Sequence, residues 1–301
     1  MRQLNQLINE IIFLCAFIFF MGCAQKTNQF EKYDPLVWSA MLAYEEGDYN
    51  KALIAFEKAF EIIPNESEND IFHAAAAALR VEKEELAEKL IRKAISGTNP
   101  SKQYYTNFHG FARFKDKPLF AAVEKDYEEL VTEYYTNLTY PKEIEDEIKL
   151  MVERDQKPRL ENKEWSEIAK VDSVNIARLI DITKEHGWVD RAWIILWHQR
   201  GSYGEKNEVW NFFKPFFDKE IAEGKRRKDF WVMFEEEQSI IDTKTQNYGG
   251  YLSQFEQFPI NDIDNVDERR AEKGLPPLWY LHKVYGQALP PSYKWKDKIK
   301  G

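Results

Sequence analysis

A histidine and an aspartate at the ends of two expected helices are the residues best suited to acid–base chemistry. His198 follows the apolar run 192–197, and an imidazole can carry a proton near neutral pH. Asp155 closes the expected helix 144–155, where the helix dipole disfavours a carboxylate. It therefore needs a partner, which is either an arginine in a structural ion pair or His198 in an acid–base pair.

Further polar side chains in the second half of the chain extend this set. Arg178, Arg269 and Arg270 are the candidate partners for the Asp155 carboxylate. The candidate catalytic residues are Asp155, His198, Arg178 and Tyr248. The candidate binding residues are Gln246, Arg269 and Arg270. A purely structural role stays open for each of them, because histidines and charged side chains at helix ends often only bond to their neighbours.

Metal and cofactor sites are not expected from the sequence. The acidic segment 261–268 offers several oxygen ligands, but Val266 and the missing glycine break the EF-hand pattern. Asp267 and Glu268 instead suit the first turn of a helix, where the dipole favours negative charge. The chain also lacks the HExxH, GxSxG, P-loop and GxGxxG motifs. We therefore assign no metal and no cofactor.

The N-terminus carries the clearest targeting signal. Residues 11–21 form an unbroken apolar run, which is shorter than the ~20 residues that a membrane-spanning helix needs. Gly22 and Cys23 follow this run, an order that resembles the lipobox of bacterial lipoproteins. We expect a signal peptide over 1–22, lipidation of Cys23 and a polar tether over 23–32. The alternative is an ordinary signal peptide or membrane anchor that contains a cysteine by chance.

Composition excludes several classes of protein. The 301 residues carry 51 acidic and 42 basic side chains, for a net charge of −9, which argues against a nucleic-acid binder. A hydrophobic content of 44% is ample for a packed core, so the chain is not intrinsically disordered. Two cysteines exclude a disulfide scaffold, and one of them lies within the expected signal peptide.

The first third has a helical period that repeats with an offset of 35 residues. Small and apolar residues recur at spacings typical of two touching helices: Leu36, Ala40, Ala43, Ala52, Phe56 and Ala59, and then Ile71, Ala75, Ala78, Ala87, Ile91 and Ala94. This pattern resembles the tetratricopeptide repeat, whose short groove binds peptides. We expect helical repeats over 33–138, with 103–136 as a third pair that covers the exposed apolar face.

The rest of the chain, 141–301, is expected to form a second helical domain. Asp172 lies where a helix N-cap is expected, before an apolar stretch that ends near Gly187. The glycine-rich segment that begins at Gln246 and ends near Pro259 predicts a turn or a small β-hairpin.

Five short motifs in this second part resemble one uncharacterised bacterial domain family, which occurs in secreted proteins and lipoproteins. They are Met151–Gln156, Asp172-x-x-Asn175-x-x-Arg178, Gly187-Trp188, Gln246-x-Tyr248-Gly249 and Asn265–Arg270 followed by Gly274–Leu278. The resemblance covers about 145–281 and implies a domain boundary, but no activity. The segment 203–208 is shorter than the family's pattern, and the turn at Gln246 is rearranged.

Together these patterns predict a mainly α-helical protein with tetratricopeptide-like hairpins, a compact helical domain and a small β-hairpin. We expect a lipid-anchored envelope protein that faces the periplasm and binds a protein or peptide on its repeats. Ala24 and Gln25 after the cysteine slightly favour the outer membrane. A hydrolase of the cell envelope, with its acid–base site in the second domain, is the alternative function.

Overall fold

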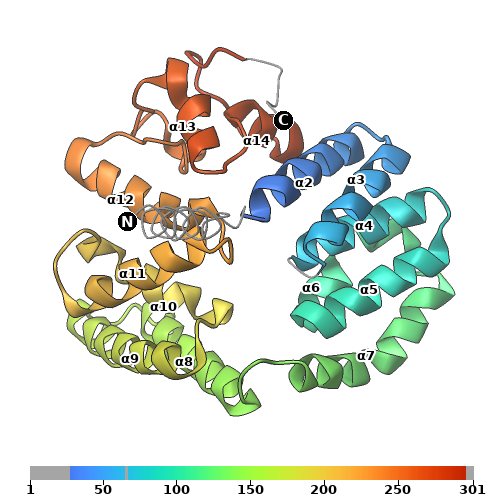
Figure 1. The fold of residues 1–301 in the computed structure, drawn as a ribbon, viewed down its shortest axis with the longest axis horizontal. Helices are drawn as coiled ribbons and strands as arrows, with labels where there is room; N and C mark the ends of the chain where they lie inside the picture. The colour runs from blue at the N-terminus through green and yellow to red at the C-terminus, as the bar shows by residue number, and fades with distance from the viewer. Residues whose placement is uncertain (1–27, 65–66, 296–301) are drawn as a thin grey trace, which may run out of the picture.

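The computed structural model describes residues 28–64 and 67–295, and these are mainly helical (Figure 1). The helices of the first half are α2 (Phe30–Glu45), α3 (Tyr49–Ile62), α4 (Glu68–Arg80), α5 (Glu84–Thr98), α6 (Lys102–Asn107) and α7 (Pro118–Thr136). Those of the second half are α8 (Lys142–Leu160), α9 (Trp165–His186), α10 (Trp193–Trp197), α11 (Glu208–Ala222), α12 (Val232–Thr243), α13 (Val266–Glu272) and α14 (Leu278–Tyr285).

The helices follow one another around a ring, which brings α14 back beside α2 (Figure 1). Helices α2 to α5 pack against their neighbours in sequence, and α7 packs on α5. No helix in the described part of the chain is both long and apolar enough to span a membrane. Cys23, the predicted lipidation site, lies outside the described residues.

The positions that define the predicted repeat form the core of the first half. Ala40 and Ala43 of α2, and Ala75 and Ala78 of α4, are fully or almost fully buried. Small side chains at these positions let the helix backbones approach closely, as the spacing predicted. The other buried positions of the pattern are Ala52, Phe56, Ala59, Ile71, Ala87, Ile91 and Ala94.

The turns within the two repeats share one backbone geometry. Gly47 has a φ of +79°, and Glu82, 35 residues later, has a φ of +61°. In each turn the next backbone N–H donates to a carbonyl of the preceding helix over 2.9 Å, Asp48 to Ala43 and Lys83 to Ala78. A left-handed φ suits glycine but strains a residue that has a Cβ, so Glu82 stores strain that Gly47 avoids.

Two large apolar cores divide the molecule, and α14 belongs to the first of them. Trp279, Tyr280 and Val284 of α14 are buried in the same cluster as the residues of α2 to α7. The Tyr280 ring lies 6.2 Å from that of Trp38. The second core joins α8 to α12. The C-terminal helix of the expected second domain therefore packs on the first repeat helix, which closes the ring.

The predicted β-hairpin after Gln246 is wrong. No strand is present among the described residues, and Gln246 makes only an isolated parallel bridge with Ile260. The physical reason is that the side chain of Glu236 on α12 accepts the backbone N–H groups of Asn247, Tyr248 and Gly250. A hairpin ladder needs such donors, so the segment folds as an irregular loop around this carboxylate instead.

The predicted N-cap at Asp172 is also wrong. Helix α9 begins at Trp165 and continues through Asp172 to His186. The Asp172 side chain accepts hydrogen bonds from the guanidinium of Arg159 on α8. The sequence suggested a cap because aspartate favours that position, whereas here an ion pair between two helices uses the same carboxylate.

Candidate functional site

Helices α8, α9 and α10 bring four ionisable side chains to one point. His198, which directly follows α10, has its Nδ1 3.0 Å from the Asp155 carboxylate on α8. The Nη2 of Arg159 donates to both carboxylate oxygens of Asp172 on α9, over 2.7 and 2.8 Å. The Nη1 of the same arginine donates over 2.7 Å to the backbone oxygen of Asp155. Three helices therefore meet in one buried polar cluster.

The chemistry open to this cluster is limited by its internal pairing. Asp155 is completely buried, and its carboxylate can hold the His198 imidazole in one orientation. Ligand atoms of Asp155, Asp172 and His198 all lie within 4.8 Å of one another, a spacing that a metal ion could bridge. Arg159 already binds both oxygens of the Asp172 carboxylate through its Nη2, so the arrangement can also serve as an ion pair that links α8 to α9.

The other two candidate catalytic residues bond elsewhere. Arg178 on α9 pairs with Glu147 over 2.7 and 2.8 Å, and this ion pair is partly exposed. The hydroxyl of Tyr248 donates to Glu235 over 2.8 Å, and burial together with that carboxylate raises the pKa of Tyr248. Of the four candidates, the structure therefore places Asp155 and His198 in contact, while Arg178 and Tyr248 each bond to a different carboxylate.

The three candidate binding residues hold backbone carbonyls of their own chain. Gln246 is fully buried. Its side-chain amide N–H groups donate to the backbone carbonyls of Tyr251 and Phe258, and its side-chain oxygen accepts the backbone N–H of Tyr251. Arg269 donates over 3.1 Å to the carbonyl of Asn247. These two side chains shape the loop that follows α12, so their bonds are directed inward.

Arg270 has the same structural role at a deeper position. Its guanidinium donates over 2.6 Å to each of the carbonyls of Pro276 and Tyr248. Burial lowers the pKa of Arg270 to about 10, although neighbouring carboxylates counteract part of that shift. Arg270 is buried and bonds to both segments, so it links the loop after α12 to the turn after α13.

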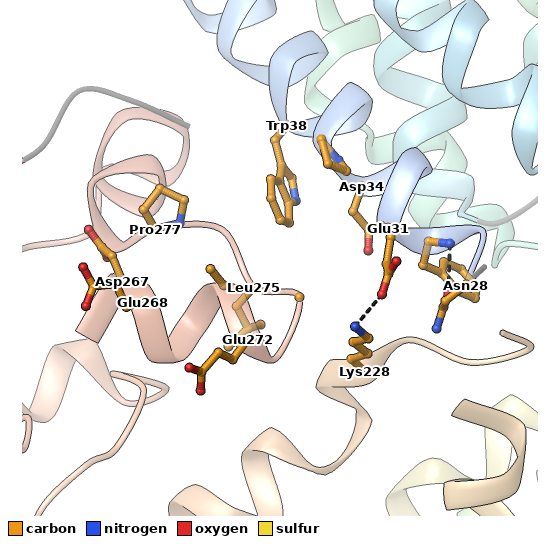
Figure 2. Close-up of a pocket in the computed structure, with 14 residues that line it drawn as sticks. Asn28, Glu31, Asp34, Trp38, Lys228, Asp267, Glu268, Glu272, Leu275 and Pro277 are labelled. Atoms are coloured by element: carbon orange, nitrogen blue, oxygen red, sulfur yellow. Dashed lines mark hydrogen bonds and ion pairs between the residues drawn. The ribbon is translucent and has the colours of Figure 1, made fainter. Parts of the chain in front are cut away.

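Sequence reasoning missed a cavity at the place where the ring closes. A space of about 610 Å³ lies between α2 on one side and α13 with the following turn on the other. Figure 2 shows Trp38 of α2 and Leu275 of the turn both directed into it. Its apolar lining residues are Phe30, Pro35, Trp38, Ala271, Leu275 and Pro277. A fold in which α14 returns to α2 creates this cavity, and periodicity alone gives no signal for that return.

Carboxylates surround the cavity and differ in how they are bonded. Glu31 pairs with Lys228, as the dashed line in Figure 2 marks, and Asp34 pairs with Arg227 over 3.0 Å. Burial raises the pKa of Asp34, although Arg227 counteracts that rise. Asp267 accepts the backbone N–H of Leu278 over 2.8 Å.

Two more carboxylates of the cavity wall form no ion pair in the part of the chain that the structure describes. Glu268 and Glu272 are exposed on α13, and neither has an ion-pair partner among the described residues. Like charges four residues apart on a helix repel each other, which costs the free protein a little stability. A cation bound in the cavity would remove that repulsion.

No family model, no curated protein and no solved structure matches this chain. The resemblances of the first third to tetratricopeptide repeats and of 145–281 to an uncharacterised domain family therefore stay predictions.

Proposed function

We propose that the protein is a lipid-anchored envelope protein that binds a peptide segment of a partner in the cavity between α2 and α13. The observation that carries this proposal is the combination of an apolar lining with two open carboxylates, Glu268 and Glu272. The cavity has a volume of about 610 Å³, which falls within the range of small-ligand sites, roughly 300–1,000 Å³. Such a space accepts a few side chains of an extended segment.

The chemistry of the lining selects the class of peptide. Trp38 and Phe30 offer aromatic surface to apolar side chains, and aromatic residues are enriched at the energetic centres of interfaces. Glu268 and Glu272 offer negative charge to lysine or arginine. We therefore expect a ligand segment in which apolar and basic residues are mixed. Since Trp38 lies on α2, the site also uses the first helix of the predicted repeats.

The proposed anchor would hold this cavity near a membrane. Asn28, which lines the cavity, lies five positions after Cys23. Five extended residues reach at most about 18 Å. A diacylglyceryl group on Cys23 would therefore keep the site close to the bilayer surface, facing the periplasm. Ala24 and Gln25 support the outer membrane as its location.

Peptide binding is tested with a matched pair of fluorescent nine-residue peptides, in which leucine and tryptophan alternate with either lysine or glutamate. Fluorescence anisotropy should show binding of the lysine peptide and at least about tenfold weaker binding of the glutamate peptide. Trp38→Ala should weaken binding of the lysine peptide by roughly tenfold or more, because truncation of an aromatic hot spot costs about 2 kcal/mol or more. Equal binding of both peptides, or an unchanged affinity after Trp38→Ala, would contradict the proposal.

The anchor is tested separately by labelling cells with radioactive palmitate. The wild-type chain should take up the label and need detergent for extraction, whereas Cys23→Ser should remain unlabelled. Cys15→Ser is the matched control, because Cys15 lies inside the expected signal peptide and its loss should leave labelling intact. An unlabelled wild-type chain would overturn the anchored half of the proposal.

A hydrolase remains the second candidate, and the contact between His198 and Asp155 is what favours it. An oriented imidazole can act as a general base once a substrate lies within hydrogen-bond reach of its free nitrogen. Screening against peptidoglycan fragments and ester substrates should then reveal a rate that Asp155→Asn lowers at least about a hundredfold. Activity that survives Asp155→Asn would remove this candidate.

A further inference from the structure

The helical pair α8 and α9 exposes an unusual set of apolar side chains. Leu160 at the end of α8 is 79% exposed, and Trp165 at the start of α9 is 71% exposed. Farther from this tip, Val174 is 63% and Leu150 is 55% exposed. Val174 and Leu150 lie at the same height along the helix pair, because their chain neighbours Asn175 and Met151 are joined by a hydrogen bond from the Asn175 side chain to the Met151 carbonyl.

Leu150 and Val174 lie on faces of α8 and α9 that also carry basic residues. On α8, Leu150, Arg154 and Lys157 are spaced by four and three residues, so they lie along one side of the helix. On α9, Lys170 and Val174 have the same relation. Helices α8 and α9 pack directly on each other, and both lie on the part of the ring opposite α2 and α3 (Figure 1). We call this surface, together with the tip that Leu160 and Trp165 form where α8 ends and α9 begins, the hairpin face.

A groove of about 440 Å³ runs between the two helices on the hairpin face. Its lining carries four basic side chains, Arg154, Lys157, Lys163 and Lys170, and two acidic ones, Glu161 and Glu167. Lys157 and Lys170 have no ion-pair partner among the described residues. The groove is thus locally positive in a protein with a net charge of −9.

We propose that the hairpin face binds the surface of an anionic bilayer. Lys157 and Lys170 would contact lipid phosphates, while Leu160 and Trp165 enter the boundary between headgroups and acyl chains. Tryptophan suits this boundary because one edge of its ring is polar and the rest is apolar. The inference rests on the proposed function, in which a lipid anchor holds the protein at a bilayer.

The charges favour a bilayer over a second copy of the chain. A two-fold dimer through the hairpin face would bring like charges of Lys157 and Lys170 toward their own copies, which disfavours pairing. An anionic bilayer offers many phosphates at once, so each basic side chain gains a partner. A protein partner with an acidic surface shares this chemistry, and the experiment below separates the two.

The test uses the mature chain with Cys23→Ser, so that no acyl group contributes to membrane binding. Vesicles of phosphatidylcholine, with and without 30% phosphatidylglycerol, are sedimented with the protein at low and at high salt. The anionic vesicles should bind at least about tenfold more protein at low salt, and high salt should abolish this difference. The double substitution Lys157→Ala and Lys170→Ala should lower the partition coefficient roughly 25-fold, at about fivefold per charge.

Two further substitutions separate insertion from charge. Trp165→Ala should lower binding about tenfold, because the apolar contact with the bilayer is lost. The matched control is Ile54→Ser with Lys58→Ala on α3, a second exposed apolar and basic pair one helical turn apart. This control should bind vesicles as the parent chain does.

The outcomes distinguish this inference from the proposed function. Equal binding to neutral and anionic vesicles, or an equal loss in the α3 control, would overturn the bilayer contact. So would an absence of vesicle binding combined with a change of oligomeric state in Trp165→Ala. If vesicle binding fails while the lysine peptide still binds, only the bilayer contact is wrong. If vesicle binding persists while peptide binding fails, only the proposed peptide site is wrong.

Discussion

The repeat half and the loop region after α12 are stabilised by different kinds of contact. In α2 to α5, alanines such as Ala40 and Ala75 let helices touch along fully buried apolar seams. In the loop region, buried polar side chains such as Glu236 and Arg270 bond directly to backbone groups. The repeat half therefore depends on close packing, whereas the loop region after α12 depends on satisfying individual donors and acceptors.

This difference determines how each region should respond to change. Close packing tolerates the loss of charge but not an added side-chain volume. A loop arranged around a buried carboxylate tolerates changes of surface volume but not the loss of that carboxylate. The following substitutions test this contrast, beginning with the largest expected effect.

Removal of the Glu236 carboxylate should have the largest effect. Glu236→Ala leaves the backbone N–H groups of Asn247, Tyr248 and Gly250 without their acceptor. We expect a loss of about 4 kcal/mol in the free energy of unfolding, measured with urea, because a buried charged network is broken. Glu256→Ala removes an exposed carboxylate in the same loop region and should cost less than about 0.5 kcal/mol. A loss below about 1 kcal/mol for Glu236→Ala would contradict the contrast.

The pH dependence of stability should reveal one buried titratable group on each side of the molecule. Burial raises the pKa of Asp229 to about 6, so the folded protein holds this proton more tightly than the unfolded chain does. The protonated Asp229 therefore contributes to the free energy of unfolding at low pH, and this contribution is lost as pH rises from about 4 to about 6. Burial lowers the pKa of His73 on α4 to about 4, so stability from His73 is lost as pH falls from about 6.5 to about 4.

Each of these effects amounts to about 3 kcal/mol, and in the wild-type chain they oppose each other. Asp229→Asn should leave a stability that rises with pH between 4 and 6.5, while His73→Gln should leave one that falls. Urea unfolding at five pH values measures both slopes. Identical slopes in the two variants would show that these groups are not buried as described.

Added volume should damage the repeat half. Ala75→Leu inserts a larger side chain where α4 is completely buried, and should cost about 2 kcal/mol through overpacking. Ala121→Leu on α7 is the matched control, because that alanine is exposed. Thermal unfolding of both variants decides the point, and an equal melting temperature would show that the helix seam has room for leucine.

The smallest effect is expected at the turn of the second repeat. Glu82→Gly should stabilise the protein by about 0.5 to 1 kcal/mol, because glycine adopts the observed φ of +61° without strain. Gly47→Ala at the equivalent turn should destabilise it by about 1 kcal/mol, although nothing lies near the added Cβ. Urea midpoints that move in the same direction for both would show that the two turns are not equivalent.

Periodicity predicted the regular part of the fold and little of the irregular part. The spacing of Ala40, Ala43, Ala75 and Ala78 identified the buried helix seams, because an apolar stripe at helical period must face a core. The same reasoning could not find Glu236, since nothing in the residues near a carboxylate shows which distant backbone groups it accepts. The hairpin expected after Gln246 was wrong for that reason.

The candidate site was anticipated in part. The position of Asp155 near the end of a helix indicated a carboxylate in need of a partner, and His198 was one of the partners considered. Arg159 was missed, although it lies one helical turn beyond Asp155, because the proline at position 158 suggested that the helix had ended. The cavity between α2 and α13 depends on the return of α14, a long-range contact that local spacing does not encode.

The central claim is that the cavity at the ring closure selects basic and apolar peptides through Glu268 and Glu272. Reversal of both charges, Glu268→Lys with Glu272→Lys, tests it most directly when the lysine and glutamate peptides are titrated by anisotropy. The claim predicts that the preference inverts, so that the glutamate peptide becomes the tighter ligand. The single substitution Glu256→Lys, outside the cavity, should leave the preference unchanged. An undiminished preference for the lysine peptide after the double reversal would contradict the claim.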